Sequence, residues 1–232
     1  MLVYGRNVAK ELLENGKDVK KIFLQDNFDD KKIISLMEKL KISVEIKPKR
    51  EMDHLCNGLH QGIILDIRDY QYSKLDDVLK KNPNFVVILD HLEDPHNFGA
   101  IIRTSEAAGV DAIIIPKDRQ VPVNSTVMKT SAGALSNMEI VCVSNLVQAI
   151  NKLKDNGFWV VGTAMENAID YKDIDYSSKM ALIIGNEGKG MSRLVMDSCD
   201  YIAKIPMVGK INSLNASVAS GIMIYEVVRN RK

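Results

Sequence analysis

Three glycines within six residues mark the segment of this sequence best suited to hold a ligand. Gly185, Gly188 and Gly190 follow a short apolar run, Leu182–Ile184, and glycine lets a backbone approach a ligand closely because it has no Cβ atom. A second apolar run at 201–205 enters another loop shortly afterwards. Two strand-to-loop transitions so close together predict a ligand site at the carboxyl ends of neighbouring strands.

The glycine loop fits neither of the common phosphate-binding patterns. A Walker loop needs a glycine where this sequence has Ile183, and a serine or threonine where it has Gly190. The dinucleotide pattern needs a small residue where Arg193 stands, and Glu187 would repel a phosphate from the middle of the loop. From these residues alone, a phosphate-free ligand held by backbone groups and a plain strand-to-helix turn are equally supported.

Polar side chains outside the glycine loop form two further candidate groups. Asn97 and Arg103 stand six positions apart, so they bridge a loop and the first turns of the helix after it. A buried arginine there would require an anion or a carboxylate as partner, whereas the local sequence favours an arginine on an exposed helix face. Ser213 and Asn215 precede the last predicted helix, which they could cap instead of lining a site.

The composition is that of a globular protein without a strong overall charge. The chain has 232 residues, 46% of them hydrophobic, and a net charge of +1, so any nucleic-acid site must be a local patch. Its three cysteines are scattered, which favours a reducing compartment over a disulfide framework. The histidines lack metal-type spacing, and neither a signal peptide nor an apolar run of about 20 residues is found. We therefore expect a cytoplasmic protein with no metal and no membrane segment.

Alternating apolar periodicities predict two α/β domains. Residues 1–70 are expected to form a small α/β unit, residues 71–83 a linker and residues 84–232 a larger domain. Runs such as 85–89 are wholly apolar, which is typical of strands buried on both faces of a parallel sheet. About six such strands, most of them followed by helices, predict a doubly wound parallel sheet. The expected helices lie at 4–15, 30–40, 51–55, 75–79, 98–108, 124–131, 145–156 and 215–228, and the expected strands at 20–24, 44–46, 63–67, 85–89, 112–115, 139–143, 158–163, 182–184 and 201–205.

Three segments in order resemble the motifs of one enzyme family. Asp94-Pro-His-Asn-Phe-Gly-Ala-Ile-Ile-Arg103 resembles the first motif of the SpoU (TrmH-type) RNA ribose 2′-O-methyltransferases of the SPOUT superfamily. Leu182-Ile-Ile-Gly-Asn-Glu-Gly-Lys-Gly-Met-Ser192 is similar to the second motif, and Ile205-Pro-Met-Val-Gly-Lys-Ile-Asn-Ser-Leu-Asn-Ala-Ser-Val-Ala219 is similar to the third. The first unit, with Tyr4-Gly-Arg-Asn-Val and His60-Gln-Gly, resembles the ribosomal-protein-like RNA-binding domain of the branch that methylates a guanosine of 23S rRNA.

This resemblance implies S-adenosyl-L-methionine as the methyl donor and RNA as the substrate. By resemblance, backbone groups of four residues hold the cofactor, namely Thr163, Gly185, Ile205 and Leu214. Five further residues match catalytic or positioning residues of the motifs, namely Arg103, Asn97, Glu187, Ser213 and Asn215. Among these, we expect Arg103 to grip the target phosphate and polarise the ribose hydroxyl, since a guanidinium is a bidentate anion binder and a poor base.

The resemblance further implies a homodimer and a deep trefoil knot between about Leu182 and Gly221, which general folding rules would not predict. The sequence leaves two alternative functions open. The protein could methylate a tRNA guanosine, or it could be a non-catalytic module that binds RNA or the ribosome. A nicotinamide-dependent oxidoreductase is disfavoured because the sequence lacks G-x-G-x-x-G.

Overall fold

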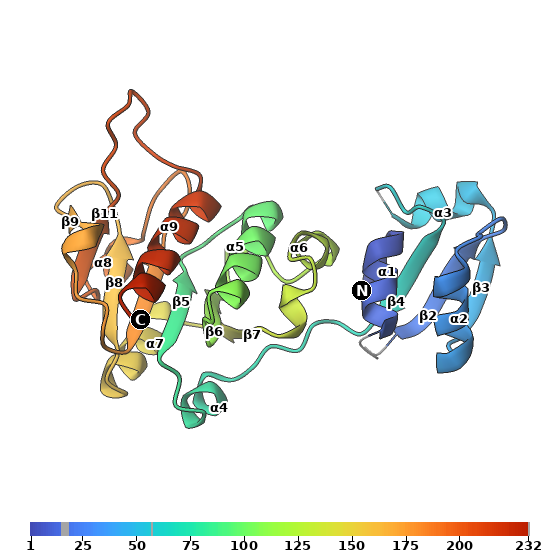
Figure 1. The fold of residues 1–232 in the computed structure, drawn as a ribbon, viewed down its shortest axis with the longest axis horizontal. Helices are drawn as coiled ribbons and strands as arrows, with labels where there is room; N and C mark the ends of the chain where they lie inside the picture. Colours follow the sequence, from blue (N-terminus) through green and yellow to red (C-terminus); the bar gives the residue numbers. More distant parts are fainter. Residues whose placement is uncertain (15–18, 57, 232) are drawn as a thin grey trace. The chain divides into compact units, whose positions relative to one another are not determined.

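The computed structural model of the chain describes residues 1–14, 19–56 and 58–231, which divide into two compact units (Figure 1). The first unit contains Met1–Gln71 together with the short segment Val123–Lys129, and the second contains Tyr72–Pro122 and Thr130–Lys232.

The first unit is built around a four-stranded mixed sheet. Its strands follow the order β1-β4-β2-β3, in which β4 is antiparallel to both of its neighbours and β3 runs parallel to β2. Its elements are β1 (Leu2–Tyr4), α1 (Arg6–Glu14), β2 (Val19–Gln25), α2 (Lys31–Leu40), β3 (Val44–Lys47), α3 (Lys49–Leu55) and β4 (Ile63–Ile67).

The N-terminal residues differ from the helix predicted at 4–15. Residues 2–4 form β1, which pairs with β4, and the helix begins only at Arg6. Gly5 adopts a φ of 101°, a conformation that suits glycine and turns the chain from the strand into the helix. Residue 15, the predicted end of that helix, lies outside the described residues. The prediction failed because a three-residue strand carries little periodicity and depends on a partner far away in the sequence.

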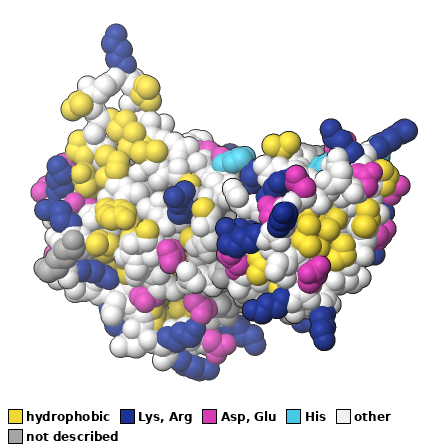
Figure 2. All heavy atoms as spheres, turned by 45° about the vertical axis from the view of Figure 1, so that its right-hand side comes forward, with side chains coloured by type: hydrophobic (Ala, Val, Ile, Leu, Met, Phe, Trp, Pro, Cys, Tyr) yellow, Lys and Arg dark blue, Asp and Glu magenta, His cyan; other side chains and the backbone are white. Residues whose placement is uncertain are grey.

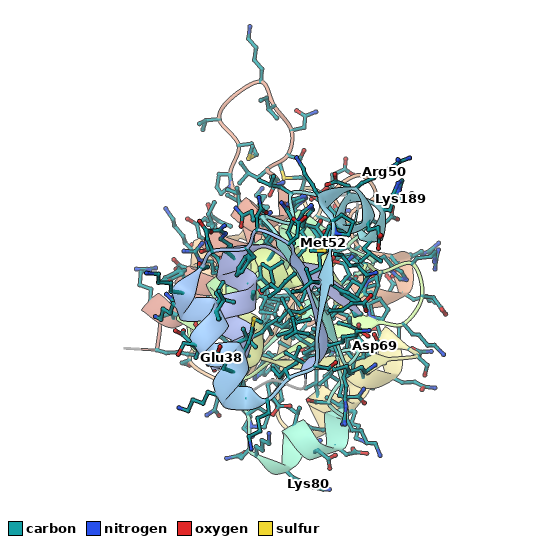
Figure 3. All side chains as sticks on the ribbon, turned by 90° about the vertical axis from the view of Figure 1, so that its right-hand side faces the viewer. Glu38, Arg50, Met52, Asp69, Lys80 and Lys189 are labelled. Atoms are coloured by element: carbon teal, nitrogen blue, oxygen red, sulfur yellow. The ribbon has the colours of Figure 1, made fainter. Side chains whose placement is uncertain are left out.

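The helices of the first unit turn apolar side chains towards its sheet. The core includes Leu12 of α1 and Ile33 of α2, packed with Ile22 and Leu65 of the strands. Asp30 caps α2 by accepting hydrogen bonds from the N–H groups of Lys32 and Ile33, each at 3.2 Å. In α3, Met52 is fully buried whereas Arg50 is exposed, and Figure 3 shows both side chains.

The second unit contains a seven-stranded sheet whose registered pairs are all parallel. The strand order is β7-β6-β5-β10-β8-β11-β9, so the parallel-sheet α/β prediction for this region is confirmed. The strands are β5 (Phe85–Leu89), β6 (Ala112–Pro116), β7 (Glu139–Val143), β8 (Trp159–Thr163), β9 (Ile169–Asp170), β10 (Met180–Ile184) and β11 (Tyr201–Lys204). The helices are α4 (Leu75–Lys80), α5 (Pro95–Ala107), α7 (Leu146–Asp155), α8 (Arg193–Met196) and α9 (Ala216–Arg229), with 3-10 turns η1 (Ala134–Ser136) and η2 (Tyr171–Asp173). Helix α6 (Ser125–Thr130) belongs to the first unit except for its last residue.

Both faces of this sheet are covered, as the wholly apolar runs predict. Every residue of β5, β6 and β10 is buried. Side chains such as Val86, Ile114 and Ile183 pack against α4, α7 and α8. Helix α9 contacts β10 and packs beside α5, and Figure 1 shows these two helices in front of the sheet. The two-residue strand β9 and the short helix α8 were not predicted, because neither is long enough to show a period.

The surface carries charges of both signs. Figure 2 shows Lys and Arg side chains interspersed with Asp and Glu on the visible face, as a net charge of +1 leads one to expect. Within the described residues, no helix combines the length and the apolar character needed to cross a membrane. The same residues contain no group of three or more His, Cys, Asp or Glu side chains placed to bind a metal ion.

Candidate active site

A cavity of about 630 Å³ lies at the carboxyl ends of three neighbouring strands of the second unit. Thr163 ends β8, Ile184 ends β10 and Ala203 lies near the end of β11, and all three line the cavity. Two loops, 185–191 and 205–214, supply most of the remaining wall. The sequence predicted a ligand site at this edge of the sheet, and the open end of a parallel sheet is where such folds bind ligands.

The glycine loop closes on itself instead of presenting its amides to a ligand. The N–H of Asn186 donates to the carbonyl of Gly190 at 3.0 Å, and the N–H of Gly190 donates back at 2.8 Å. The side-chain oxygen of Asn186 accepts the N–H groups of Gly188 and Lys189, at 2.9 and 3.2 Å. A phosphate nest needs such N–H groups free. The geometry therefore agrees with a ligand that carries no phosphate.

Gly185 is required by the loop backbone itself. A Cβ atom at this position would lie 2.5 Å from the carbonyl carbon of Gly190 and 2.6 Å from the nitrogen of Met191. No side chain can be placed there without moving that peptide, so glycine allows the two sides of the loop to meet.

The connection after β5 anchors both ends of the glycine loop. Asp90 is 1% exposed, and its carboxylate accepts the N–H of Ser192 at 2.6 Å. The side-chain amide of Asn186 donates to the carbonyl of His91 at 2.7 Å. Asp90 was not among the residues predicted from the sequence to belong to the site. Its position directly after a buried strand was the available signal, because functional side chains often stand there.

A chain of hydrogen bonds joins one polar side chain from each of the three motif segments. The amide nitrogen of Asn97 donates to the carboxylate of Glu187, and the amide nitrogen of Asn215 donates to the oxygen of Asn97 at 3.0 Å. Asn97 is only 7% exposed, so both of these hydrogen bonds are shielded from water on its side. The chain holds the start of α5, the glycine loop and the start of α9 in a fixed arrangement.

Two helix caps complete this arrangement. Asn215 caps α9, since its side-chain oxygen accepts the N–H of Ser217 at 2.9 Å. Asp94 caps α5 by accepting the N–H of His96 at 2.9 Å, and this hydrogen bond holds the pKa of the Asp94 carboxyl below its usual value. Asn215 therefore both caps its helix and contacts Asn97, whereas the sequence left capping and site roles as alternatives.

The structure brings most of the candidate residues to this cavity. Six of them line it, namely Thr163, Gly185, Glu187, Ile205, Ser213 and Leu214. Asn97 is joined to it by donating to Glu187, and Asn215 is joined to it indirectly, by donating to Asn97. Arg103 is exposed on α5, is not among the lining residues and forms no ion pair within the described part of the chain. This placement agrees with the exposed helix face that the local sequence favoured for Arg103.

Methionines form an apolar part of the cavity that sequence reasoning did not identify. Met165, Met191, Met196 and Met207 all line it. Methionine is flexible and polarisable, so such a wall adapts to a flat aromatic ligand such as a purine. The four residues are spread over 43 positions, and no local pattern connects them.

Comparison with known proteins identifies the family. Residues 84–225 match the SpoU rRNA Methylase family. This chain belongs to the SpoU family of RNA methyltransferases. Residues 2–73 match the RNA 2′-O ribose methyltransferase substrate-binding domain. A Staphylococcus epidermidis protein assigned to the TrmH family of tRNA/rRNA methyltransferases is 45% identical over 239 residues, covering 100% of this SpoU-family chain and 96% of that protein.

Solved structures share the fold of this SpoU-family chain. The SpoU methyltransferase AviRb from Streptomyces viridochromogenes, solved in complex with the cofactor AdoMet, superposes with a TM-score of 0.82 at 25% identity and covers 99% of this chain and 89% of its own. An AdoMet-bound rRNA methyltransferase from Sinorhizobium meliloti has a TM-score of 0.80 at 26% identity and covers 98% and 86%. The A. aeolicus TrmH/SpoU tRNA modifying enzyme has a TM-score of 0.58 at 30% identity and covers 67% and 81%.

Proposed function

We propose that this protein transfers the methyl group of S-adenosyl-L-methionine to a ribose 2′-hydroxyl of RNA, at a guanosine of 23S rRNA. The single observation that carries the proposal is the cavity at the ends of β8, β10 and β11. It gathers residues of the second and third motif segments and is tied to the first through Asn97.

The cofactor, which carries no phosphate group, would occupy this cavity. Backbone groups of four lining residues would hold it, namely Thr163, Gly185, Ile205 and Leu214. The side chain of Thr163 already donates to the carbonyl of Ile183 at 3.0 Å, so the backbone of Thr163 is the part left to contact a ligand. The methionine wall suits the adenine ring of the cofactor. The backbone N–H groups of Gly188 and Lys189 already donate to Asn186, so they are not assigned to the cofactor.

Catalysis would depend chiefly on placing the two reacting groups. The ribose 2′-oxygen attacks the methyl carbon in line, the carbon–sulfur bond breaks with its electrons moving to sulfur, and S-adenosylhomocysteine leaves. The hydroxyl proton must also depart. A guanidinium stays protonated in proteins, so Arg103 would grip the target phosphate and polarise the hydroxyl, while a phosphate oxygen or water takes the proton.

The remaining motif side chains would position the target nucleotide. Glu187 and Ser213 line the cavity, and Asn97 and Asn215 fix Glu187 through the chain of hydrogen bonds. The target must be splayed out of its helix, because A-form RNA does not present this hydroxyl to a deep pocket.

A homodimer would complete each site in this proposal. Arg103 stands exposed and outside the cavity lining, so it is free to meet RNA or a site of a second copy. We further propose that the segment from Leu182 to Gly221 forms a deep trefoil knot and that the protein acts in the cytoplasm. The fold shared with SpoU methyltransferase structures supports the knot.

The extent of the structural matches favours ribosomal RNA over tRNA. The S. meliloti rRNA methyltransferase matches 98% of this chain, whereas the A. aeolicus tRNA modifying enzyme matches 67%. A tRNA guanosine is the second candidate, because the tRNA modifying enzyme reaches 30% identity over the part that it shares.

Mapping 2′-O-methyl sites in the RNA of a strain that lacks this gene tests the proposal. We expect one 23S rRNA guanosine to lose its methyl group and to regain it when the wild-type gene returns. If a gene carrying Arg103→Ala restores that methyl group equally well, Arg103 does not have the proposed role. Loss of a tRNA methyl group instead would establish the second candidate, and an unchanged methylation map would refute both.

A further inference from the structure

The first unit contains a second cavity, of about 820 Å³, which the proposed methyl transfer does not use. Three loops form it: the turn from β1 into α1, the loop after β2, and the loop between α3 and β4. We call it the loop pocket. Its lining residues include Arg6, Asn27, Phe28, Leu59 and Gln61.

The loop pocket brings together the two N-terminal segments that the sequence analysis singled out. The N–H of Arg6 donates to the side-chain oxygen of Gln61 at 2.9 Å, and the Nε of Arg6 donates to the carbonyl of Gln61 at 3.3 Å. A Cβ atom on Gly5 would lie 3.4 Å from that side-chain oxygen, an ordinary contact distance, so it is the φ of 101° that favours glycine at this position. Contacts between residues 55 positions apart therefore define one wall of the loop pocket.

A buried histidine fixes the described residues that directly precede β4. His60 is 5% exposed, its Nε2 lies 3.0 Å from the carboxylate of Asp53, and its Nδ1 accepts the N–H of Gly62 at 2.9 Å. Gln61 and Gly62 both have positive φ, 53° and 82°. Because both ring nitrogens have partners, His60 holds residues 60–62 in place without a bound ligand.

Flat and apolar groups remain accessible on this fixed frame. The guanidinium of Arg6 lies over the ring of Phe28, 5.1 Å from its centroid, and pairs with Asp29 at 3.0 Å. The Arg6 side chain is nevertheless 43% exposed, and Leu59 is 75% exposed. Guanidinium planes and aromatic rings are the surfaces on which single-stranded RNA bases stack.

The charge of the loop pocket argues against a phosphate as its ligand. Arg6 and Lys49 are offset by Asp29 and Asp53, which also line it. Side-chain amides such as that of Asn27 can pair with the edge of a neutral heterocycle. A planar, uncharged and hydrogen-bonding ligand fits this composition better than an anion.

We propose that the loop pocket binds an unpaired nucleobase of the RNA substrate, stacked on Arg6 and Leu59. The proposal rests on the proposed function for the class of ligand. The match of residues 2–73 to a substrate-binding domain supports it.

The test measures RNA affinity of the full-length protein with a pair of matched variants. Leu59→Glu removes the apolar contact from the loop pocket, whereas Ile46→Glu makes the same change at a residue of β3 that is 68% exposed and does not line the pocket. The probes are deproteinised 23S rRNA from a strain lacking the gene and a blunt RNA duplex in which every base is paired. A third variant, Arg6→Lys, keeps the positive charge but removes the planar guanidinium group.

We expect Leu59→Glu and Arg6→Lys to weaken binding to 23S rRNA about tenfold, as loss of one stacked base should. Ile46→Glu should stay within about twofold of wild type, and binding to the duplex and to S-adenosylmethionine should not change in any variant. Equal losses from Leu59→Glu and Ile46→Glu, an equal loss on the duplex, or no loss at all would overturn the proposal. So would a wild-type protein that binds neither RNA.

The same data separate this proposal from the proposed function. If binding to 23S rRNA depends on Leu59 but no methyl group is transferred, the proposed reaction fails and the loop pocket stands. If methyl transfer proceeds while Leu59→Glu leaves both KM and RNA affinity at the wild-type value, the reaction stands and the loop pocket fails.

Discussion

Gly185→Ala should disrupt cofactor binding although it adds a single methyl group. The new Cβ would lie 2.5 Å from the carbonyl carbon of Gly190, and ordinary contacts begin near 3.4 Å. The peptide between Gly190 and Met191 must therefore retreat by about 0.9 Å (3.4 − 2.5). That movement strains the two hydrogen bonds that join Asn186 and Gly190, and with them the loop that walls the cavity.

The expected size of the effect follows from the cost of overpacking. Forcing a methyl group into a closely packed site typically costs about 1–3 kcal/mol. If the bound state carries that cost, the Kd for S-adenosylmethionine rises by about fivefold to 150-fold, since about 1.4 kcal/mol corresponds to tenfold.

Isothermal titration calorimetry with S-adenosylmethionine measures this Kd directly. The matched control is Gly209→Ala, because a Cβ there meets no atom within 4 Å and Gly209 does not line the cavity. Circular dichroism establishes that both variants are folded. A folded Gly185→Ala protein that binds the cofactor as tightly as Gly209→Ala would refute the account of the glycine loop.

Three further predictions address catalysis, the hydrogen-bond chain and pH. Arg103→Lys should keep the Kd for S-adenosylmethionine but lower single-turnover methyl transfer about tenfold or more, because lysine cannot bind a phosphate bidentately; an unchanged rate would contradict this. Asn97→Ala removes a buried link to Glu187 and should cost about 1–3 kcal/mol, seen as a melting temperature several degrees lower; an unaltered melting curve would show that the link contributes little. Hydrogen bonds from Arg229 hold the pKa of Glu226 below its ordinary value of 4.5. The ionised carboxylate therefore stabilises the fold at pH values above 4.5, and this stabilisation is lost as the pH falls through the lowered pKa of the folded protein. Urea unfolding between about pH 6 and pH 3 should show a smaller acid-induced loss for Glu226→Gln than for wild type, and equal losses would exclude this contribution.

The catalytic sheet could be predicted from the sequence because its strands are unusual. Runs such as Phe85–Leu89 are wholly apolar, and every residue in that run is buried. Strand β1 could not be predicted in the same way, since three residues at 2–4 show no period. Its existence depends on pairing with β4, in which Leu2 lies opposite Asp66. That partner strand is distant in the sequence, so the pairing can be identified only from the tertiary structure.

For the candidate site as well, the residues could be predicted from the sequence but their contacts could not. Residue types and family resemblance identified Asn97, Glu187 and Asn215 as candidates, each within its own segment of the sequence. Their mutual hydrogen bonds span 90 and 118 positions, and no local pattern encodes contacts of that range. From the sequence, the glycines predicted either access for a ligand or a plain strand-to-helix turn. The structure gives Gly185 a different role, because Gly190 occupies the space where its side chain would be.

The loop pocket had no counterpart in the sequence analysis. Its walls come from three loops separated by helices and strands, and residues such as Arg6, Phe28 and Leu59 are unremarkable in their local context. Only the segments Tyr4-Gly-Arg and His60-Gln-Gly carried a signal, and that signal was a resemblance rather than a physical argument.

The most direct test of the central claim is the transfer of a deuterated methyl group from S-adenosylmethionine to 23S rRNA taken from a strain that lacks the gene. After single turnover with the purified protein, the RNA is digested to nucleosides and examined by mass spectrometry. The account predicts the label on the ribose of one guanosine, as 2′-O-methylguanosine. Label on a base, or a cofactor-bound protein that leaves all RNA unlabelled, would contradict it.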